Sequence, residues 1–295
     1  MSRQSPNDQL VLGLPKGSLQ ESTLDLFSRA GYSITVPSRS YSLSIDDEQM
    51  AGLMFRAQEM SRYVEDGVVD VGLTGYDWIC ENGSQVVQVC ELIYAKQRMT
   101  PVRWVLAVPE EGPVKQVEDL RGGIVATELV QVTRKYFQDR DLEVKVEFSY
   151  GATEAKARIL DGIVDVTETG SSLRANGLKV IDTILTSSTR LIANAEAMRV
   201  DWKRRKSENI ALLLQGAIEA RGKIGLKMNL HRESLPVVME LLPSEKSPTV
   251  SELAESGWVA VEVVLEERVE RELVPQLKRA GASGIITYPL SKVIP

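Results

Sequence analysis

One short segment near the middle of the chain combines the side chains that a sugar phosphate needs. It reads Asp165-Val-Thr-Glu-Thr-Gly-Ser-Ser-Leu-Arg174 and lies between a predicted strand and a predicted helix. The hydroxyls and backbone amides of Thr169 to Ser172 suit a phosphate, because the positive end of a helix dipole points at the anion. Asp165 and Glu168 repel a bare phosphate, so their expected partners are sugar hydroxyls or a phosphate-bound Mg²⁺. The segment therefore predicts a binding site for ribose 5-phosphate. The alternative is that Thr169 or Ser171 only caps the helix.

Two other strand–loop–helix segments offer polar groups to the same ligand. In Leu12-Gly-Leu-Pro-Lys-Gly-Ser-Leu19 the loop presents Lys16, and Gly17 permits close approach of the backbone, although a simple turn explains the residues equally well. The glycine spacing matches neither a Walker loop nor G-x-G-x-x-G. In residues 126–135 the loop presents Thr127. Further cations near predicted strand ends are Arg56, Lys96, Arg98 and Arg103.

Alternating strands and helices must position these segments. We expect strands over 10–14, 68–73, 102–108, 123–126, 144–148 and 163–166, with helices over 17–30, 57–66, 130–139 and 154–161. Alternation without hairpin signals predicts βαβ units and largely parallel sheets.

An internal sequence repeat, called the internal echo below, indicates that the chain contains two similar lobes. Residues 66–75 (DGVVDVGLTG) and 161–170 (DGIVDVTETG) agree at most positions at a constant offset of 95. Common turn dipeptides are the alternative explanation. Two α/β lobes whose strand ends face each other place a ligand cleft between them, outside the carboxyl ends of the strands.

The pattern changes near residue 223. Strands are expected over 224–230, 257–265 and 284–288, helices over 235–242 and 266–280, and one more strand near 247–253. This order predicts a ferredoxin-like domain with a regulatory or assembly role. We therefore expect a first lobe formed by residues 1–102 with 186–215, a second lobe over 103–185, and a third domain over 216–295.

Composition limits the possible partners. The net charge of −6 argues against broad nucleic-acid binding, and no apolar run is long enough to cross a membrane. The polar N-terminus lacks the apolar core of a signal peptide, which favours a cytoplasmic protein. Two cysteines ten residues apart and the single His231 suggest neither a disulfide framework nor a zinc site.

The motifs together resemble the long-form ATP phosphoribosyltransferases, which catalyse the first step of histidine biosynthesis. The resemblance covers nearly the whole chain, in the family's order. The segments that carry it in the lobes are 14–19 (LPKGSL), 70–77 (DVGLTGYD), 125–128 (VATE) with Thr133-Arg134, and 165–173. In the third domain they are 247–250 (SPTV), 258–261 (WVAV) and 281–285 (GASGI), which look like the family's regulatory domain.

The resemblance implies condensation of ATP with phosphoribosyl pyrophosphate (PRPP) to N1-(5-phosphoribosyl)-ATP and pyrophosphate, with Mg²⁺ required. It implies lobes like those of periplasmic binding proteins, an ACT-like third domain that binds histidine as feedback inhibitor, and a homo-oligomer growing from dimers to hexamers. Catalytic roles are implied for Lys16, Asp165 and Glu168. Substrate contacts are expected for Arg56, Asp70, Thr74, Thr127, Thr167, Thr169, Gly170, Ser171 and Ser172. Effector contacts are expected for Ser247, Thr249 and Val250. No residue is assigned directly to the metal, which is expected mainly through PRPP.

The chemistry suits the residues. Adenine N1 carries its own lone pair, so the protein needs only to position two anions and to stabilise the departing pyrophosphate. A two-lobed small-molecule sensor without catalysis is the alternative, because a fold alone does not establish a function.

Overall fold

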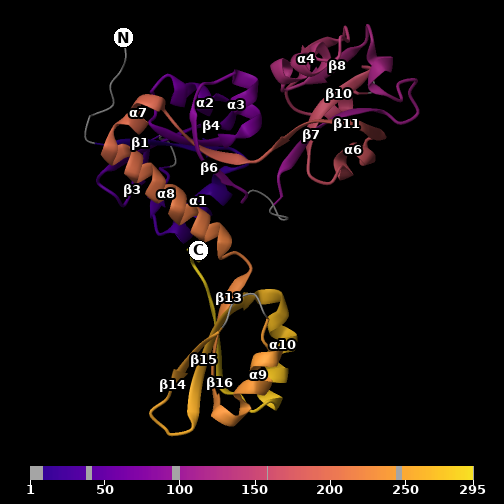
Figure 1. Cartoon of the computed structure of the whole chain (residues 1–295). Coiled ribbons are helices and arrows are strands. Elements are labelled where there is room, and N and C mark those ends of the chain that lie inside the picture. The colour runs from indigo at the N-terminus through magenta and orange to yellow at the C-terminus, as the bar shows by residue number, and fades with distance from the viewer. Residues whose placement is uncertain (1–8, 38–41, 95–99, 158, 244–247, 295) are drawn as a thin grey trace. The chain divides into compact units, whose positions relative to one another are not determined.

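The computed structural model describes residues 9–37, 42–94, 100–157, 159–243 and 248–294. The chain forms two compact units, residues 1–211 and 212–295, and the boundary between them lies within helix α8 (Asp201–Glu219). The first unit contains two α/β lobes, and the second is a small antiparallel domain (Figure 1).

The first lobe is built on a seven-stranded sheet with the order β2-β3-β4-β1-β5-β12-β6. Its strands are β1 (Leu10–Lys16), β2 (Ile34–Thr35), β3 (Ser42–Ile45), β4 (Met50–Arg56), β5 (Val71–Gly75), β6 (Val87–Leu92) and β12 (Thr189–Ala193). Its helices are α1 (Gln20–Ala30), α2 (Ala57–Glu65), α3 (Tyr76–Asn82), α7 (Ala195–Arg199) and the start of α8. Helix α2 packs closely on the sheet because Gly13 and Gly72 lack side chains. A Cβ at either position would lie 2.5 or 2.7 Å from Met60 Sδ.

The second lobe is built on a five-stranded sheet with the order β11-β7-β10-β8-β9. Its strands are β7 (Val102–Pro109), β8 (Ile124–Thr127), β9 (Lys145–Phe148), β10 (Gly162–Thr167) and β11 (Leu178–Ser187). Its helices are η1 (Val117–Leu120), α4 (Val130–Gln138), α5 (Thr153–Lys156) and α6 (Ser171–Ala175). The chain crosses between the lobes twice, after β6 and after β11.

The expectation of largely parallel sheets is only partly correct. The central pairs β1–β4, β1–β5, β8–β10 and β8–β9 are parallel, as βαβ units require. Strands β7, β11 and β12 pair antiparallel with their neighbours. The two crossings cause this, because each brings the chain into the other lobe beside a strand that runs the opposite way.

The second unit has the predicted ferredoxin-like fold. Its elements are β13 (Lys223–His231), η2 (Arg232–Ser234), α9 (Leu235–Leu241), β14 (Thr249–Glu252), β15 (Trp258–Glu266), α10 (Glu267–Arg279) and β16 (Ser283–Pro289). The sheet order is β14-β15-β13-β16 and all neighbours are antiparallel. Alternate residues of β13 and β15 pack with α9 and α10 into one apolar core. Together with the two lobes, this confirms the predicted fold class.

Candidate active site

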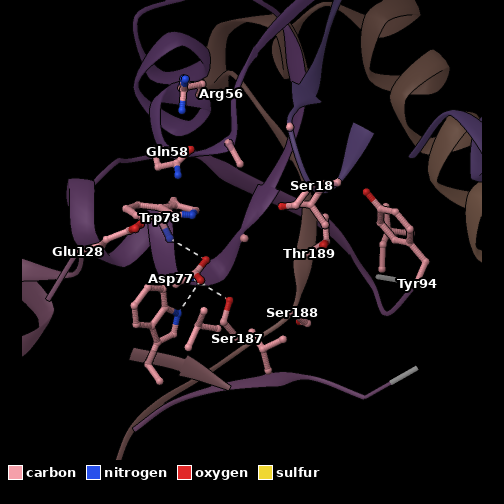
Figure 2. Close-up of a pocket in the computed structure, with 18 of the residues that line it drawn as sticks. Ser18, Arg56, Gln58, Asp77, Trp78, Tyr94, Glu128, Ser187, Ser188 and Thr189 are labelled. Atoms are coloured by element: carbon pink, nitrogen blue, oxygen red, sulfur yellow. Dashed lines mark hydrogen bonds between the residues drawn. The ribbon is translucent and has the colours of Figure 1, made fainter. Parts of the chain in front are cut away.

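A pocket of about 380 Å³ opens where the two lobes meet. The residues that follow β1, the junction between β4 and α2, and the start of α3 line it from the first lobe, and both chain crossings contribute. Figure 2 shows that its polar side chains converge from these elements. The polar residues that line it are Lys16, Ser18, Arg56, Gln58, Asp77, Thr100, Glu128, Asp165, Ser187, Ser188 and Thr189, and its aromatic residues are Trp78, Tyr94, Trp104 and Tyr150.

Two of the predicted cations enter this pocket side by side. Lys16 and Arg56 are the last residues of β1 and β4, and the two residues are directly paired in that parallel ladder. The Arg56 guanidinium donates to the hydroxyl of Tyr150, in the second lobe, at 2.8 Å. The sheet register therefore places two positive charges together at the carboxyl ends of neighbouring strands.

Asp165 reaches the pocket from the other lobe. It lies on β10 opposite Val105 of β7, and its Oδ1 accepts a hydrogen bond from Val166 N at 2.7 Å. Burial raises the pKa of the Asp165 carboxyl to about 6, and the nearby charges of Glu154 and Glu128 act in the same direction. A ligand that brings a hydrogen-bond donor or a cation would therefore stabilise the ionised form of this carboxylate.

The predicted phosphate loop follows directly after Asp165, at the carboxyl end of β10. Thr167 Oγ1 accepts from Gly170 N at 2.7 Å, and Ser172 Oγ donates to Glu154 Oε1 at 3.0 Å. Gly170 has φ +72°, which suits glycine, and it is the N-cap residue of α6. The alternative of local capping is met in part, because Thr169 Oγ1 accepts from Ser171 N, the first amide of α6, at 3.4 Å. The residues from Thr167 to Ser172 do not themselves line the pocket.

Asp77 is a pocket residue that the sequence did not single out. Its Oδ2 accepts from Trp104 Nε1 at 2.7 Å and its Oδ1 from Trp78 N at 3.0 Å (Figure 2). Burial raises the pKa of this carboxyl, and these hydrogen bonds oppose the rise. Glu128 was also missed as a site residue; burial raises its pKa as well, and Asp77 adds to that effect.

Asp70, a predicted substrate contact, lies away from the pocket and is paired with a cation of the chain itself. Asp70 comes just before β5, at the opposite end of that strand from the pocket. Its oxygens accept from Lys203 Nζ at 2.9 and 2.8 Å and from Val11 N at 2.8 Å. Asp70 and Lys203 are 8% and 6% exposed, so the pair ties α8 to the sheet rather than facing a ligand.

The other expected contacts are distributed as follows. Thr74 donates to Ala57 O at 2.7 Å and Thr127 accepts from Leu129 N at 3.0 Å, and both are fully buried beside the pocket rather than lining it. Thr249 and Val250 lie exposed on β14. Ser247, Lys96 and Arg98 lie outside the described residues.

Two carboxylates of the pocket, Asp165 and Glu128, have the donor type that magnesium takes in proteins. Among the described residues, no group of three or more His, Cys, Asp or Glu side chains is arranged to hold a metal ion. Asp165 and Glu128 both line the pocket and repel each other electrostatically. Hard carboxylate oxygens suit Mg²⁺, which usually takes one or two carboxylates plus substrate phosphates. Within the described parts of the chain, no helix is long and apolar enough to span a membrane.

Similarity to known proteins covers almost the entire chain. A family model described as ATP phosphoribosyltransferase matches residues 56–216, and one described as HisG, C-terminal domain, matches residues 220–292. The ATP phosphoribosyltransferase of Chlorobaculum parvum is 54% identical over 289 residues, 98% of either chain. That of Thermodesulfovibrio yellowstonii is 56% identical over 287 residues, 97% of this chain and 98% of the other.

A solved structure is similar to part of the chain. It is the ATP phosphoribosyl transferase (HisG:HisZ) complex from Thermotoga maritima, with 27% identity and a TM-score of 0.61. The match covers 98% of that chain but 72% of this one. More than a quarter of the present chain therefore has no counterpart in the matched one.

Proposed function

Because this chain belongs to the ATP phosphoribosyltransferase family and transfers the phosphoribosyl group of PRPP to ATP, we propose that the pocket between its lobes is the active site. The observation that carries the proposal is the pairing of Lys16 and Arg56 at neighbouring strand ends, in one pocket with Asp165 of the other lobe. Two anionic substrates need cations, and a ribose needs an acceptor for its hydroxyls. The relatives are named ATP phosphoribosyltransferase, which is an enzyme, so the sensor alternative is not retained.

Different residues are assigned to different parts of PRPP. Asp165 accepts hydrogen bonds from the ribose hydroxyls, and Glu168 assists at the sugar or its metal. Amides and hydroxyls of Thr167 and Thr169 to Ser172 hold the 5-phosphate. Lys16 and Arg56 stabilise the pyrophosphate as negative charge develops on it. Adenine N1 attacks ribose C1 with its own lone pair, so positioning and charge stabilisation are the protein's main contributions.

The family needs a metal for catalysis, and we propose that it is Mg²⁺. Asp165 and Glu128 are the carboxylates that would face it, and substrate phosphates would supply most of its other ligands. When bound, Mg²⁺ neutralises charge on pyrophosphate and so makes it a better leaving group.

The second unit is proposed to regulate and assemble the enzyme. Histidine would bind at Ser247, Thr249 and Val250, of which Thr249 and Val250 lie on β14. The face of the sheet opposite α9 and α10 carries Val264 and Ile286, which are 50% and 59% exposed. Exposed apolar side chains on an uncovered sheet face favour contact with a second copy of the chain.

Pyrophosphate release from ATP and PRPP tests the site assignment. Arg56→Gln removes one pocket cation and should lower kcat/KM for PRPP by about 10- to 100-fold, as expected for a lost charge-assisted hydrogen bond to the leaving group. Arg62→Gln, on the exposed face of the adjoining helix α2, is the matched control and should behave like the wild type. Equal activity in both variants would refute the assignment of this pocket.

A further inference from the structure

Helix α4 of the second lobe begins without a cap of its own. Its N-cap residue, Leu129, makes no side-chain capping bond, and its first turn contains no acidic residue. The first amides of a helix have no partner within the helix and need acceptors from elsewhere. The beginning of α4 therefore depends on a group outside its own segment.

That group is Glu81, on α3 of the first lobe. Both of its oxygens accept from Gln131 N at 2.9 Å, and Oε2 also accepts from Val132 N at 3.0 Å. Gln131 and Val132 are the second and third residues of α4. A carboxylate at this place satisfies two amides and complements the positive end of the helix dipole.

The start of helix α3 also contacts the second lobe. Asp77, one turn before Glu81, accepts from Trp104 Nε1 of β7, and Asp77 N donates to Ser187 Oγ at 3.0 Å, where β11 ends. The rings of Trp78 and Trp104 meet edge to face with centroids 6.2 Å apart. Two carboxylates on one helix thus fasten both a strand and a helix of the neighbouring lobe.

The α4 cap lies close to the proposed active site along the chain. Leu129 separates α4 from Glu128, which lines the pocket, and Thr127 accepts from Leu129 N at 3.0 Å. We therefore expect a shift of the first turn of α4 to displace Glu128, which is one residue away from the helix. The wall of the pocket that the second lobe supplies depends on a contact with the first.

We propose that Glu81 is a positioning residue for phosphoribosyl transfer, because by capping α4 from the neighbouring lobe it holds the Glu128 wall of the pocket against Lys16 and Arg56. This inference rests on the proposed function of the pocket. Reacting atoms must approach to about 3 to 3.5 Å, and small misplacements reduce the rate strongly. The effect is therefore expected mainly in kcat, while PRPP binding, to which the loop of the second lobe contributes most, is largely preserved.

The test uses Glu81→Gln in the full chain, with Glu65→Gln as matched control. Glu65 also accepts a hydrogen bond from a backbone amide, that of Gln85 at 2.9 Å, but within the first lobe. Pyrophosphate release is measured far below the melting temperature, so that all variants are fully folded. Glu81→Gln removes the charge and leaves one acceptor oxygen for two amides, so it should lower kcat by about 2- to 30-fold, a range set by the free energy of a helix cap. The dissociation constant for PRPP should change less than twofold.

A second substitution separates positioning from helix stability. Gln131→Glu in the Glu81→Gln background gives α4 an acid in its own first turn without bridging the lobes. The double variant should regain melting temperature but not kcat. Wild-type kcat in Glu81→Gln, or recovery of kcat in the double variant, would overturn the proposal. Because Arg56→Gln tests the pocket itself, an impaired Arg56→Gln beside a fully active Glu81→Gln would reject only the role of Glu81.

Discussion

Replacing Asp165 by Asn should separate catalysis from stability. The substitution keeps the shape of the side chain and removes the charge that would strengthen hydrogen bonds from the ribose hydroxyls. Each charge-assisted bond contributes about 1.5 to 3 kcal/mol, which corresponds to roughly a 10- to 150-fold loss in kcat/KM for PRPP. The KM for ATP should change much less, because the adenine and triphosphate are not expected to contact this carboxylate.

The same substitution should leave the protein at least as stable as the wild type. The folded protein raises the pKa of Asp165 to about 6, mainly through burial, so the ionised form opposes folding at neutral pH. The group contributes most stability at low pH, and that contribution declines as pH rises from about 4 to about 6. Discounted for its partial exposure, removal of the charge should stabilise by about 1 kcal/mol, or roughly 2 to 4 °C in Tm.

The pH profile gives an independent measurement. If ionised Asp165 binds the ribose, kcat/KM for PRPP should fall as pH drops below about 6. The phosphates of PRPP also titrate in this range, so the profile of Asp165→Asn is the reference. The wild-type profile should fall near pH 6, and the profile of Asp165→Asn should lack this fall.

Asp161→Asn is the matched control for these measurements. Asp161 is exposed and accepts from Ile124 N at 2.8 Å in the same lobe. Its loss should lower Tm and leave kcat/KM unchanged. If instead Asp165→Asn lowered Tm and retained normal PRPP kinetics, the assignment of Asp165 to the ribose would be refuted.

Three further outcomes follow from described contacts. Gly170→Asp should weaken PRPP affinity by roughly tenfold more than Gly170→Asn. Both variants share the strain of φ +72°, but only aspartate repels a phosphate. Equal dissociation constants for the two variants would exclude a phosphate next to Gly170. Asp70→Asn leaves the buried Lys203 ammonium without its counter-charge and should lower the free energy of unfolding by about 3 kcal/mol, a fall in Tm on the order of 10 °C. Its kinetics at low temperature should be unchanged, and a kinetic defect in fully folded protein would indicate that Asp70 contacts a ligand. A chain ending at Arg221 should keep its folded lobes and lose inhibition by histidine in the pyrophosphate assay, and inhibition that persists would place the effector elsewhere.

The sequence predicted the parts of the site that depend on local pattern. Strand-to-helix segments led to Lys16 and Asp165, and both line the pocket because strand ends gather at one edge of each sheet. Asp77 was missed because an acid in the first turn of a helix is ordinary. Its importance comes from Trp104, on a strand of the other lobe, and local sequence carries no information about that contact.

Other departures have similar physical causes. Strand β4 was not predicted, since Gly52 weakens the strand pattern; in the fold a Cβ there would lie 2.8 Å from Leu43 Cβ, so glycine is what permits the packing. The antiparallel strands were missed because a residue pattern does not state the direction of its neighbour. The role of Asp70 depends on Lys203, 133 residues further along the chain.

Asp70 and Asp165 occupy the same place in the internal echo, yet they meet opposite electrostatic surroundings. Asp70 faces an ammonium group that the chain itself supplies, and the result is a permanent tie between helix and sheet. The charges that act on Asp165 are those of Glu154 and Glu128, which are negative. If the pocket is the active site as proposed, a metal-loaded sugar phosphate should offset these two negative charges and bind more readily than a bare one. Two copies of one motif thus differ in their partners: one carboxylate is held by a buried ammonium of the chain itself, and the other lies beside two further carboxylates.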